Sequence, residues 1–171
     1  MEVYISHDEI VEMAKRIAGE INEKFNGKNP LLVCVLKGAA AFHAELVKHI
    51  DIDVELDYIQ ASSYEGTKST GVVVLKKDLD TDIYGRDVIL VEDIVDTGLT
   101  MSTARSELAQ RHPRSLTFVT MLDKPSRRVV EFTPDYVGKT IDDLFVFGFG
   151  LDVDEKYRHL KDICVFKEHK H

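Results

Sequence analysis

The residues best suited to chemistry lie in one string, VILVEDIVDTGLT, at positions 88–100. Its first part, residues 88–91, is typical of a strand buried on both faces of a parallel sheet, and ligands bind beyond the carboxyl ends of such strands. Glu92 and Asp93 stand at that end. Two adjacent carboxylates need partners such as sugar hydroxyls, a cation or water, so we expect a hydroxylated, cation-bound ligand there.

A phosphate-binding turn is predicted directly after these carboxylates, at residues 96–100 (DTGLT). Backbone N–H groups and the hydroxyls of Thr97 and Thr100 can donate to a phosphate at a helix start, and Gly98 permits a tight turn. The alternative is that Asp96 and Thr97 only cap the helix and that the two carboxylates are solvated, because Asp, Thr and Gly are ordinary capping residues. The complete string favours a site for a phosphorylated sugar.

Two lysines follow other predicted strands. Lys37 and Gly38 come after the apolar residues 31–36, where the ammonium and nearby N–H groups could bind a pyrophosphate. Lys124 comes just after the apolar residues 116–122. Because lysine is mostly exposed in proteins, each of these side chains could instead be a solvated charge.

The elements that would position these residues begin with a helix after Ser6, which forms a capping box with Glu9. Apolar residues then recur at helical spacing up to a stop at Gly27, namely Ile10, Ala14, Ile17, Ile21 and Phe25. Residues 31–36 predict a buried strand, and the alanine-rich residues 39–48 predict a second helix.

The alternation of strands and helices continues along the chain. Residues 54–59 predict a strand with alternating character, in which Val54, Leu56 and Tyr58 are apolar and Glu55 and Asp57 are acidic. A helix at residues 101–108 ends before Pro113, and a further strand is predicted at residues 116–122. This order predicts an α/β fold.

Two stretches depart from this alternation. Residues 61–71 are polar and contain glycine before apolar residues resume at 72–75, so we predict a mobile loop there. Residues 136–166 offer only short apolar runs, at 144–149 and 163–166, and predict a small cap beside the main sheet.

Composition limits the class of protein. A chain of 171 residues fits one domain, and a formal net charge of −8 argues against nucleic acid as the main partner. Cys34 and Cys164 lie in apolar runs without metal-ligand spacing, so we expect reduced core residues and a cytoplasmic location. Neither a membrane span nor a secretion signal is expected, and the close pair His169 and His171 in a charged tail makes a structural zinc site improbable.

Residues 88–100 closely resemble the phosphoribosyl-pyrophosphate (PRPP) binding motif of the type I phosphoribosyltransferases. Residues 36–39 (LKGA) resemble the pyrophosphate loop of the hypoxanthine-guanine branch, often with a cis peptide before the lysine. The resemblance implies a central, mostly parallel sheet flanked by helices, with a small hood built from the chain-terminal segments. It also implies a single domain over residues 1–171, with a core at roughly 30–140 and the C-terminal part of the hood at 141–171.

The resemblance implies roles at the purine end of the site. Lys124 matches the lysine that donates to the purine 6-oxo group, and an ammonium, which only donates, disfavours the amino group of adenine. Phe145 resembles the ring that stacks on the purine, while Val146 offers backbone groups to its edge, although periodicity alone predicts both in the core. Asp152 also lies near the purine in this family.

At the PRPP end, the resemblance assigns pyrophosphate to Lys37, Gly38 and Arg158 and the ribose hydroxyls to Glu92 and Asp93. It assigns magnesium to Glu92, Asp93 and Asp152, although by charge alone Asp152 and Arg158 could equally belong to a solvated stretch.

The phosphate turn carries two further assignments from the resemblance. Asp96 is the candidate general base, or charge stabiliser, at N7 of the purine. Leu99 belongs to the same PRPP motif but occupies a place where some members carry a basic residue, so any contact from that basic side chain is absent here.

Ser62, Ser63 and Tyr64 resemble the start of the catalytic lid, which keeps water from the reacting sugar. From composition alone, this segment could equally be a surface loop without a role. Arg127 and Arg128 receive no assignment.

Together these matches imply a purine-salvage transferase that uses Mg²⁺ to move 5-phosphoribosyl from PRPP to N9 of hypoxanthine, and of guanine, giving IMP or GMP and pyrophosphate. The family resemblance further implies a homodimer or homotetramer. Two alternatives remain: a regulator of this fold that senses PRPP or a nucleotide and binds RNA or protein, and a transferase for xanthine or a pyrimidine. The set Lys37, Asp96, Lys124 and Asp152 argues against the regulator, and Lys124 favours 6-oxopurines without ranking them.

Overall fold

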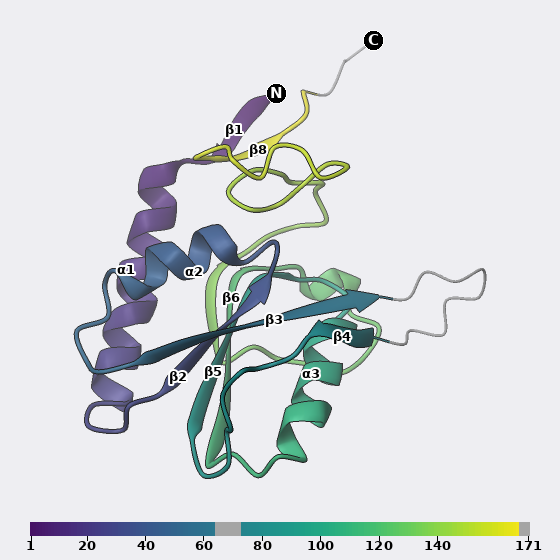
Figure 1. The fold of residues 1–171 in the computed structure, drawn as a ribbon. Coiled ribbons are helices and arrows are strands. Elements are labelled where there is room, and N and C mark those ends of the chain that lie inside the picture. Colours follow the sequence, from purple (N-terminus) through teal and green to yellow (C-terminus); the bar gives the residue numbers. More distant parts are fainter. Residues whose placement is uncertain (64–72, 168–171) are drawn as a thin grey trace.

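A six-stranded sheet forms the centre of the computed structural model, which describes residues 1–63 and 73–167 (Figure 1). Its strand order is β4-β3-β2-β5-β6-β7, and every neighbouring pair is parallel except β3 and β4. The strands are β2 (Leu31–Leu36), β3 (Glu55–Ser63), β4 (Val73–Lys77), β5 (Asp87–Val95), β6 (Ser115–Asp123) and β7 (Tyr136–Thr140). The predicted α/β fold with a mostly parallel sheet is confirmed.

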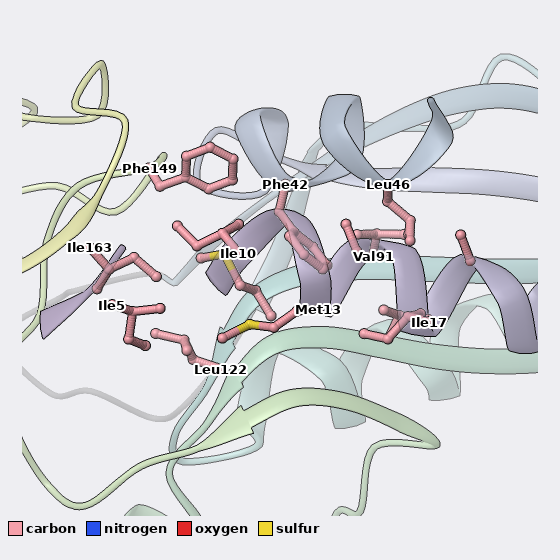
Figure 2. Close-up of a cluster of buried hydrophobic side chains, with 14 of the residues drawn as sticks. Ile5, Ile10, Met13, Ile17, Phe42, Leu46, Val91, Leu122, Phe149 and Ile163 are labelled. Carbon is pink, nitrogen blue, oxygen red and sulfur yellow. The ribbon is translucent and has the colours of Figure 1, made fainter. Parts of the chain in front are cut away.

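Helices cover both faces of this sheet. Buried residues of α1 (His7–Lys24) and α2 (Ala40–Val47) share a core cluster with Leu32 of β2, whereas α3 (Leu99–Ala109) shares a second cluster with Leu31 and Val33. Successive strand residues therefore point to opposite faces, as the pleat of a strand requires. In Figure 2, Ile10 and Ile17 of α1 lie beside Phe42 and Leu46 of α2 and Val91 of β5.

The first helix begins where its sequence predicts. The Ser6 hydroxyl accepts a hydrogen bond from the Glu9 backbone N–H at 3.2 Å, which satisfies one of the free donors at the helix start. The predicted apolar positions are buried, namely Ile10, Ala14, Ile17, Ile21 and Phe25. The third helix starts earlier than predicted, at Leu99 instead of residue 101.

In β3, two apolar residues of the alternating pattern are exposed and one of its acidic residues is buried. Leu56 and Tyr58 are 43% and 38% exposed, whereas Asp57 is only 3% exposed. The Asp57 carboxylate accepts hydrogen bonds from the backbone N–H groups of Asp80 and Thr81, each at 3.0 Å, and so fixes the turn after β4. Alternation of apolar and polar residues indicates a strand, but it does not determine which of the two sets is buried.

The two ends of the chain meet in a separate two-stranded sheet. Strand β1 (Glu2–Ile5) pairs antiparallel with β8 (Ile163–Val165), as seen at the top of Figure 1. Ile5 and Ile163 pack into the same cluster as α1 (Figure 2). This is the hood of chain-terminal segments that the family resemblance implied. The cap predicted from residue 136 starts later, because β7 pairs with β6 in the main sheet.

The remaining sequence expectations concern single residues and loops. Cys34 and Cys164 are unpaired and buried, and burial raises the pKa of the Cys34 thiol to about 12, helped by the nearby carboxylates of Glu92 and Asp93. The strand β3 continues to Ser63, and the rest of the predicted mobile loop lies outside the described residues, as does the His169 and His171 pair. Within residues 1–63 and 73–167, no helix is both long and apolar enough to cross a membrane.

Candidate active site

The carboxyl ends of three neighbouring strands bring the predicted site residues to one edge of the sheet. Strand β2 pairs with β5, and β5 pairs with β6, all in parallel, with Val95 opposite Asp123 at the last registered position of β5 and β6. Lys37 follows β2, the phosphate turn follows β5 and Lys124 follows β6. Ligands of open α/β sheets bind at such an edge.

The turn after β5 has the shape that a phosphate site requires. Gly98 lies at the N-cap of α3 with φ of +83°, and a Cβ atom there would lie 3.2–3.3 Å from Phe132, Arg128 and Val130, so glycine fits this position best. The N-cap residue of α3 is Gly98, which has no side chain to cap the helix. Thr97 accepts from the N–H of Leu99, the first helical residue, so the capping alternative holds for this one donor, whereas Asp96 accepts only from the Thr97 N–H before the helix. The helix start remains suited to an anion.

Side chains within the turn bond locally to its backbone. Asp96 Oδ1 accepts from the Thr97 N–H at 2.7 Å, and Thr97 Oγ1 accepts from the Leu99 N–H at 3.3 Å. The Asp96 side chain is exposed at the sheet edge, whereas Thr100 is half-buried at the first turn of α3. The structure thus places Asp96, Thr97, Gly98, Leu99 and Thr100 in one turn, as predicted.

Glu92 and Asp93 form the acidic floor of the site. Burial raises the pKa of Glu92 well above its usual range, and the neighbouring charge of Asp93 adds to this; burial also raises the pKa of Asp93. The Asp93 carboxylate packs against Gly38, where a Cβ atom would fall within 1.8 Å of Asp93 Oδ2. Two such carboxylates are suited to bind sugar hydroxyls or a cation.

The loop after β2 lies between this floor and the C-terminal segment. The Leu36–Lys37 peptide bond is cis, as in the pyrophosphate loops that this segment resembles. A Cβ atom on Gly150 would lie 2.1 Å from the Gly38 carbonyl oxygen, so the two backbones touch. This contact places Lys37 and Gly38 next to the segment that carries Asp152 and Arg158.

Arg158 lies at the centre of an ionic cluster on that segment. Its guanidinium donates to the Gly150 carbonyl at 2.7 Å and to Glu155 Oε1 at 3.2 Å, and Nη2 lies 3.6 Å from Asp152 Oδ2. Glu155 also pairs with Lys37, with 3.2 Å between Oε2 and Nζ. The Lys37 and Arg158 hydrogen bonds lower the pKa of Glu155. Glu155 is not predictable from the sequence, because a glutamate in a charged stretch carries no distinguishing spacing.

The predicted purine end has one buried lysine and one exposed ring. The Lys124 side chain is only 12% exposed, and its Nζ lies 3.9 Å from Asp143 Oδ1. Val146 is buried, but Phe145 is 61% exposed and stacks on Phe166 with ring centroids 6.3 Å apart. Periodicity, which predicted both residues in the core, was therefore wrong for Phe145. An exposed aromatic face is what base stacking needs.

Arg128, which received no assignment from the sequence, supports the phosphate turn from behind. Its guanidinium donates to the carbonyls of Val95 and Asp96 at 3.2 and 3.0 Å, and to that of Phe132 at 2.8 Å. It also pairs with Asp123 at 2.7 Å. Arg127, in contrast, is half-exposed and lies 3.5 Å from Asp143. No sequence pattern signals these contacts, since their acceptors are mostly backbone carbonyls.

Two further predictions concern the lid and the metal ligands. Ser62 and Ser63 end β3, and Tyr64 lies outside the described residues. Among residues 1–63 and 73–167, no three His, Cys, Asp or Glu side chains are grouped closely enough to hold a metal ion by themselves. Magnesium, however, is commonly bound by one or two carboxylates together with substrate phosphates, and Glu92 with Asp93 fits that requirement.

Comparisons with known proteins agree with this arrangement. The family described as "Phosphoribosyl transferase domain" matches residues 4–156. A hypoxanthine-guanine phosphoribosyltransferase from Streptococcus pneumoniae is 49% identical over 168 residues, covering 98% of this chain and 93% of the relative. One from Lactococcus lactis is 46% identical, covering 97% and 91%.

Solved structures give the same result. A hypoxanthine-guanine phosphoribosyltransferase from Bacillus anthracis superposes with a TM-score of 0.93 at 43% identity, covering 98% of this chain and 99% of that one. A hypoxanthine phosphoribosyltransferase from Staphylococcus aureus gives a TM-score of 0.93 at 40% identity, covering 98% and 91%. Both relatives therefore share the fold along nearly the whole chain.

Proposed function

Because this chain belongs to the phosphoribosyl transferase domain family, we propose that it transfers the 5-phosphoribosyl group of PRPP to N9 of a 6-oxopurine and releases pyrophosphate. The relatives named above supply the base: each is named for hypoxanthine, and three of the four also for guanine. The observation that carries the proposal is the meeting of the phosphate turn, Lys37 and Lys124 at the adjoining ends of β5, β2 and β6. This is a purine-salvage reaction.

At the PRPP end, the turn at residues 96–100 binds the 5-phosphate through backbone N–H groups and threonine hydroxyls. Glu92 and Asp93 hold the ribose hydroxyls. As the bond to pyrophosphate breaks, positive charge builds on the ribose and negative charge on the leaving group. Lys37 and Arg158 stabilise the departing pyrophosphate, so catalysis is largely electrostatic positioning.

At the purine end, Lys124 donates to the 6-oxo group, Phe145 stacks on the ring and the Val146 backbone binds its edge. Asp96, exposed on the phosphate turn, takes or stabilises the proton at N7 as N9 attacks the ribose.

Magnesium is the proposed cofactor, with Glu92, Asp93 and Asp152 as its protein ligands, directly or through water. When bound, it would neutralise charge on the pyrophosphate. The two adjacent carboxylates support this, because burial disfavours their charged forms and raises both pKa values, and a bound cation would offset that cost. We further place the protein in the cytoplasm as a homodimer or homotetramer, by analogy with the family.

The test is Asp96→Asn, measured by pyrophosphate release with hypoxanthine and, separately, by PRPP binding. The asparagine can still accept from the Thr97 N–H, so the turn is preserved. Turnover should fall about 10²- to 10⁴-fold, the usual contribution of general acid–base catalysis, while the Kd for PRPP changes less than about threefold.

The matched control is Asp82→Asn, since Asp82 likewise accepts from a nearby backbone N–H, that of Tyr84 at 3.0 Å, but lies on the turn before β5. This control should keep full turnover. If Asp96→Asn also keeps full turnover, Asp96 has no role in the transfer step.

A further inference from the structure

Glu155 occupies a position between the two cations that the proposed function assigns to pyrophosphate. Its Oε2 lies 3.2 Å from Lys37 Nζ, and its Oε1 lies 3.2 Å from Arg158 Nη2. One carboxylate thus joins two positive groups from different parts of the fold, and Lys37 lies 118 residues from Glu155 in sequence. A bidentate anion between a lysine and an arginine is also the arrangement that a bound phosphate group would adopt.

We propose that Glu155 is an internal counter-ion, which occupies the pyrophosphate position in the free protein and is displaced when PRPP or pyrophosphate binds. This inference rests on the proposed function, because it takes Lys37 and Arg158 as the groups that bind pyrophosphate. Glu155 then competes with the ligand for Lys37 and Arg158. On binding, the Glu155 carboxylate is exchanged for the pyrophosphate group.

The backbone holds Glu155 in this place. Asp154 and Glu155 have φ of +51° and +69°, in the left-handed region that non-glycine residues rarely adopt, and Val153 pairs with Lys156 across this tight turn. The Glu155 N–H donates to Asp152 Oδ2 at 2.9 Å. The turn therefore presents the Glu155 carboxylate to Lys37 and Arg158 at the cost of an uncommon backbone conformation.

The ion pairs of Glu155 are weak enough for a ligand to displace its carboxylate. Both Lys37 and Glu155 are more than half exposed, and an exposed ion pair shifts an equilibrium by no more than about fivefold. Pyrophosphate carries several negative charges and many acceptor oxygens, so it competes well with a single carboxylate. Among the described residues, Arg158 also has a buried Nε–H without an acceptor, so Glu155 leaves the guanidinium incompletely paired.

Removing the Glu155 charge should therefore make the site bind anions more tightly. In Glu155→Gln, the amide keeps the shape of the side chain but no longer neutralises Lys37 and Arg158. We expect the Kd of magnesium pyrophosphate, measured by titration calorimetry, to fall about 3- to 10-fold, since the two ion pairs of Glu155 are lost as competitors. The thermal unfolding midpoint should stay within a degree or two, because Lys37 and Glu155 are more than half exposed and Arg158 keeps its hydrogen bond to the Gly150 carbonyl.

The matched control is Asp154→Asn, which removes the neighbouring exposed carboxylate that does not contact Lys37 or Arg158. Asp154→Asn removes one negative charge, as Glu155→Gln does, so it controls for the effect of net charge on anion binding. Its Kd for magnesium pyrophosphate should change less than about twofold. An equal gain in both variants would mean that net charge, not displacement, is responsible, and would overturn the inference.

Other outcomes separate this inference from the proposed function. If wild-type protein binds magnesium pyrophosphate and Glu155→Gln binds it equally or more weakly, then Glu155 organises the cations instead of competing for them, and only the inference fails. If wild-type protein binds neither pyrophosphate nor PRPP, the proposed function fails and the inference falls with it.

Discussion

Lys124 is the residue proposed to select the class of base. Its side chain is mostly buried and its ammonium can only donate, so any ligand atom that meets it must accept a hydrogen bond. A 6-oxo group accepts, whereas the 6-amino group of adenine donates and would leave buried donors facing each other. In the proposed role, the side chain would discriminate by the cost of an unpaired donor more than by shape.

Substituting Lys124→Gln should relax this discrimination. A glutamine amide both donates and accepts, so hypoxanthine loses a charged partner while adenine loses the repulsion. We expect kcat/KM for hypoxanthine to fall at least about tenfold and the ratio of hypoxanthine to adenine to narrow by a similar factor, as measured by initial rates with each base.

Arg127→Gln is the control for this substitution, because Arg127 pairs with the same Asp143 carboxylate from a more exposed position. It should leave the base preference unchanged. An unchanged preference in Lys124→Gln as well would show that Lys124 does not read the 6-position.

The candidate site residues differ in how well they can be predicted from the sequence. Lys37, Asp96 and Lys124 are predictable, because each follows a strong apolar strand whose carboxyl end is a known place for ligands. Phe145 was misplaced in the core by periodicity, and Glu155 was missed. Both depend on the path of an irregular segment with positive φ angles, which apolar spacing does not record.

At the scale of elements, the phosphate turn is supported by the short segment after β6. This segment begins with the 3₁₀ turn Pro125–Arg127 and continues to Phe132, where the Arg128 guanidinium links the carbonyls of Val95 and Asp96 to the Asp123 carboxylate. The Val129 N–H also donates to the Thr97 carbonyl at 3.0 Å. The ends of β5 and β6 are thereby held at a fixed spacing, and with them the two substrate positions.

Replacing Arg128→Lys should loosen this support. A lysine has one ammonium and cannot reach the separate acceptors that the planar guanidinium serves. Losing the bonds to the Val95 and Asp96 carbonyls should raise the KM for PRPP about tenfold, equivalent to roughly 1.4 kcal/mol, with a smaller change in kcat. Steady-state kinetics with PRPP varied at saturating hypoxanthine measures both values.

Arg127→Lys provides the comparison, since Arg127 is half-exposed and makes a single 3.5 Å pair. It should behave as wild type. If Arg128→Lys and Arg127→Lys have the same KM for PRPP, the phosphate turn keeps its shape without Arg128.

Strand and helix positions were well predicted where the physical signal is strong. The strand at Leu31–Leu36 and the first helix follow from continuous burial and from a cap with helical spacing. The burial of Asp57 in β3 and the strand β7 were not predicted, because Asp57 is buried through backbone hydrogen bonds and β7 is a short strand of intermediate burial. Both outcomes depend on tertiary partners.

The whole molecule joins two sets of proposed site residues. The sheet edge supplies the phosphate turn, Glu92 and Lys124, while the C-terminal segment supplies Phe145 and Arg158 and is tied to the N-terminus through the pairing of β1 with β8. The close contact of Gly38 with Gly150 connects the two sets. A reaction of two substrates needs such an arrangement, because PRPP and the base must meet in a fixed orientation.

Pyrophosphate release by the wild-type protein tests the central claim most directly. The protein would be given PRPP and magnesium with hypoxanthine, guanine, xanthine, adenine or uracil in separate reactions, and the nucleotide product would be identified by mass. We predict turnover with 6-oxopurines, hypoxanthine among them, and turnover with adenine and uracil at least about 10⁴-fold lower. PRPP binding without turnover on any base would contradict the account and favour a regulator that keeps this fold.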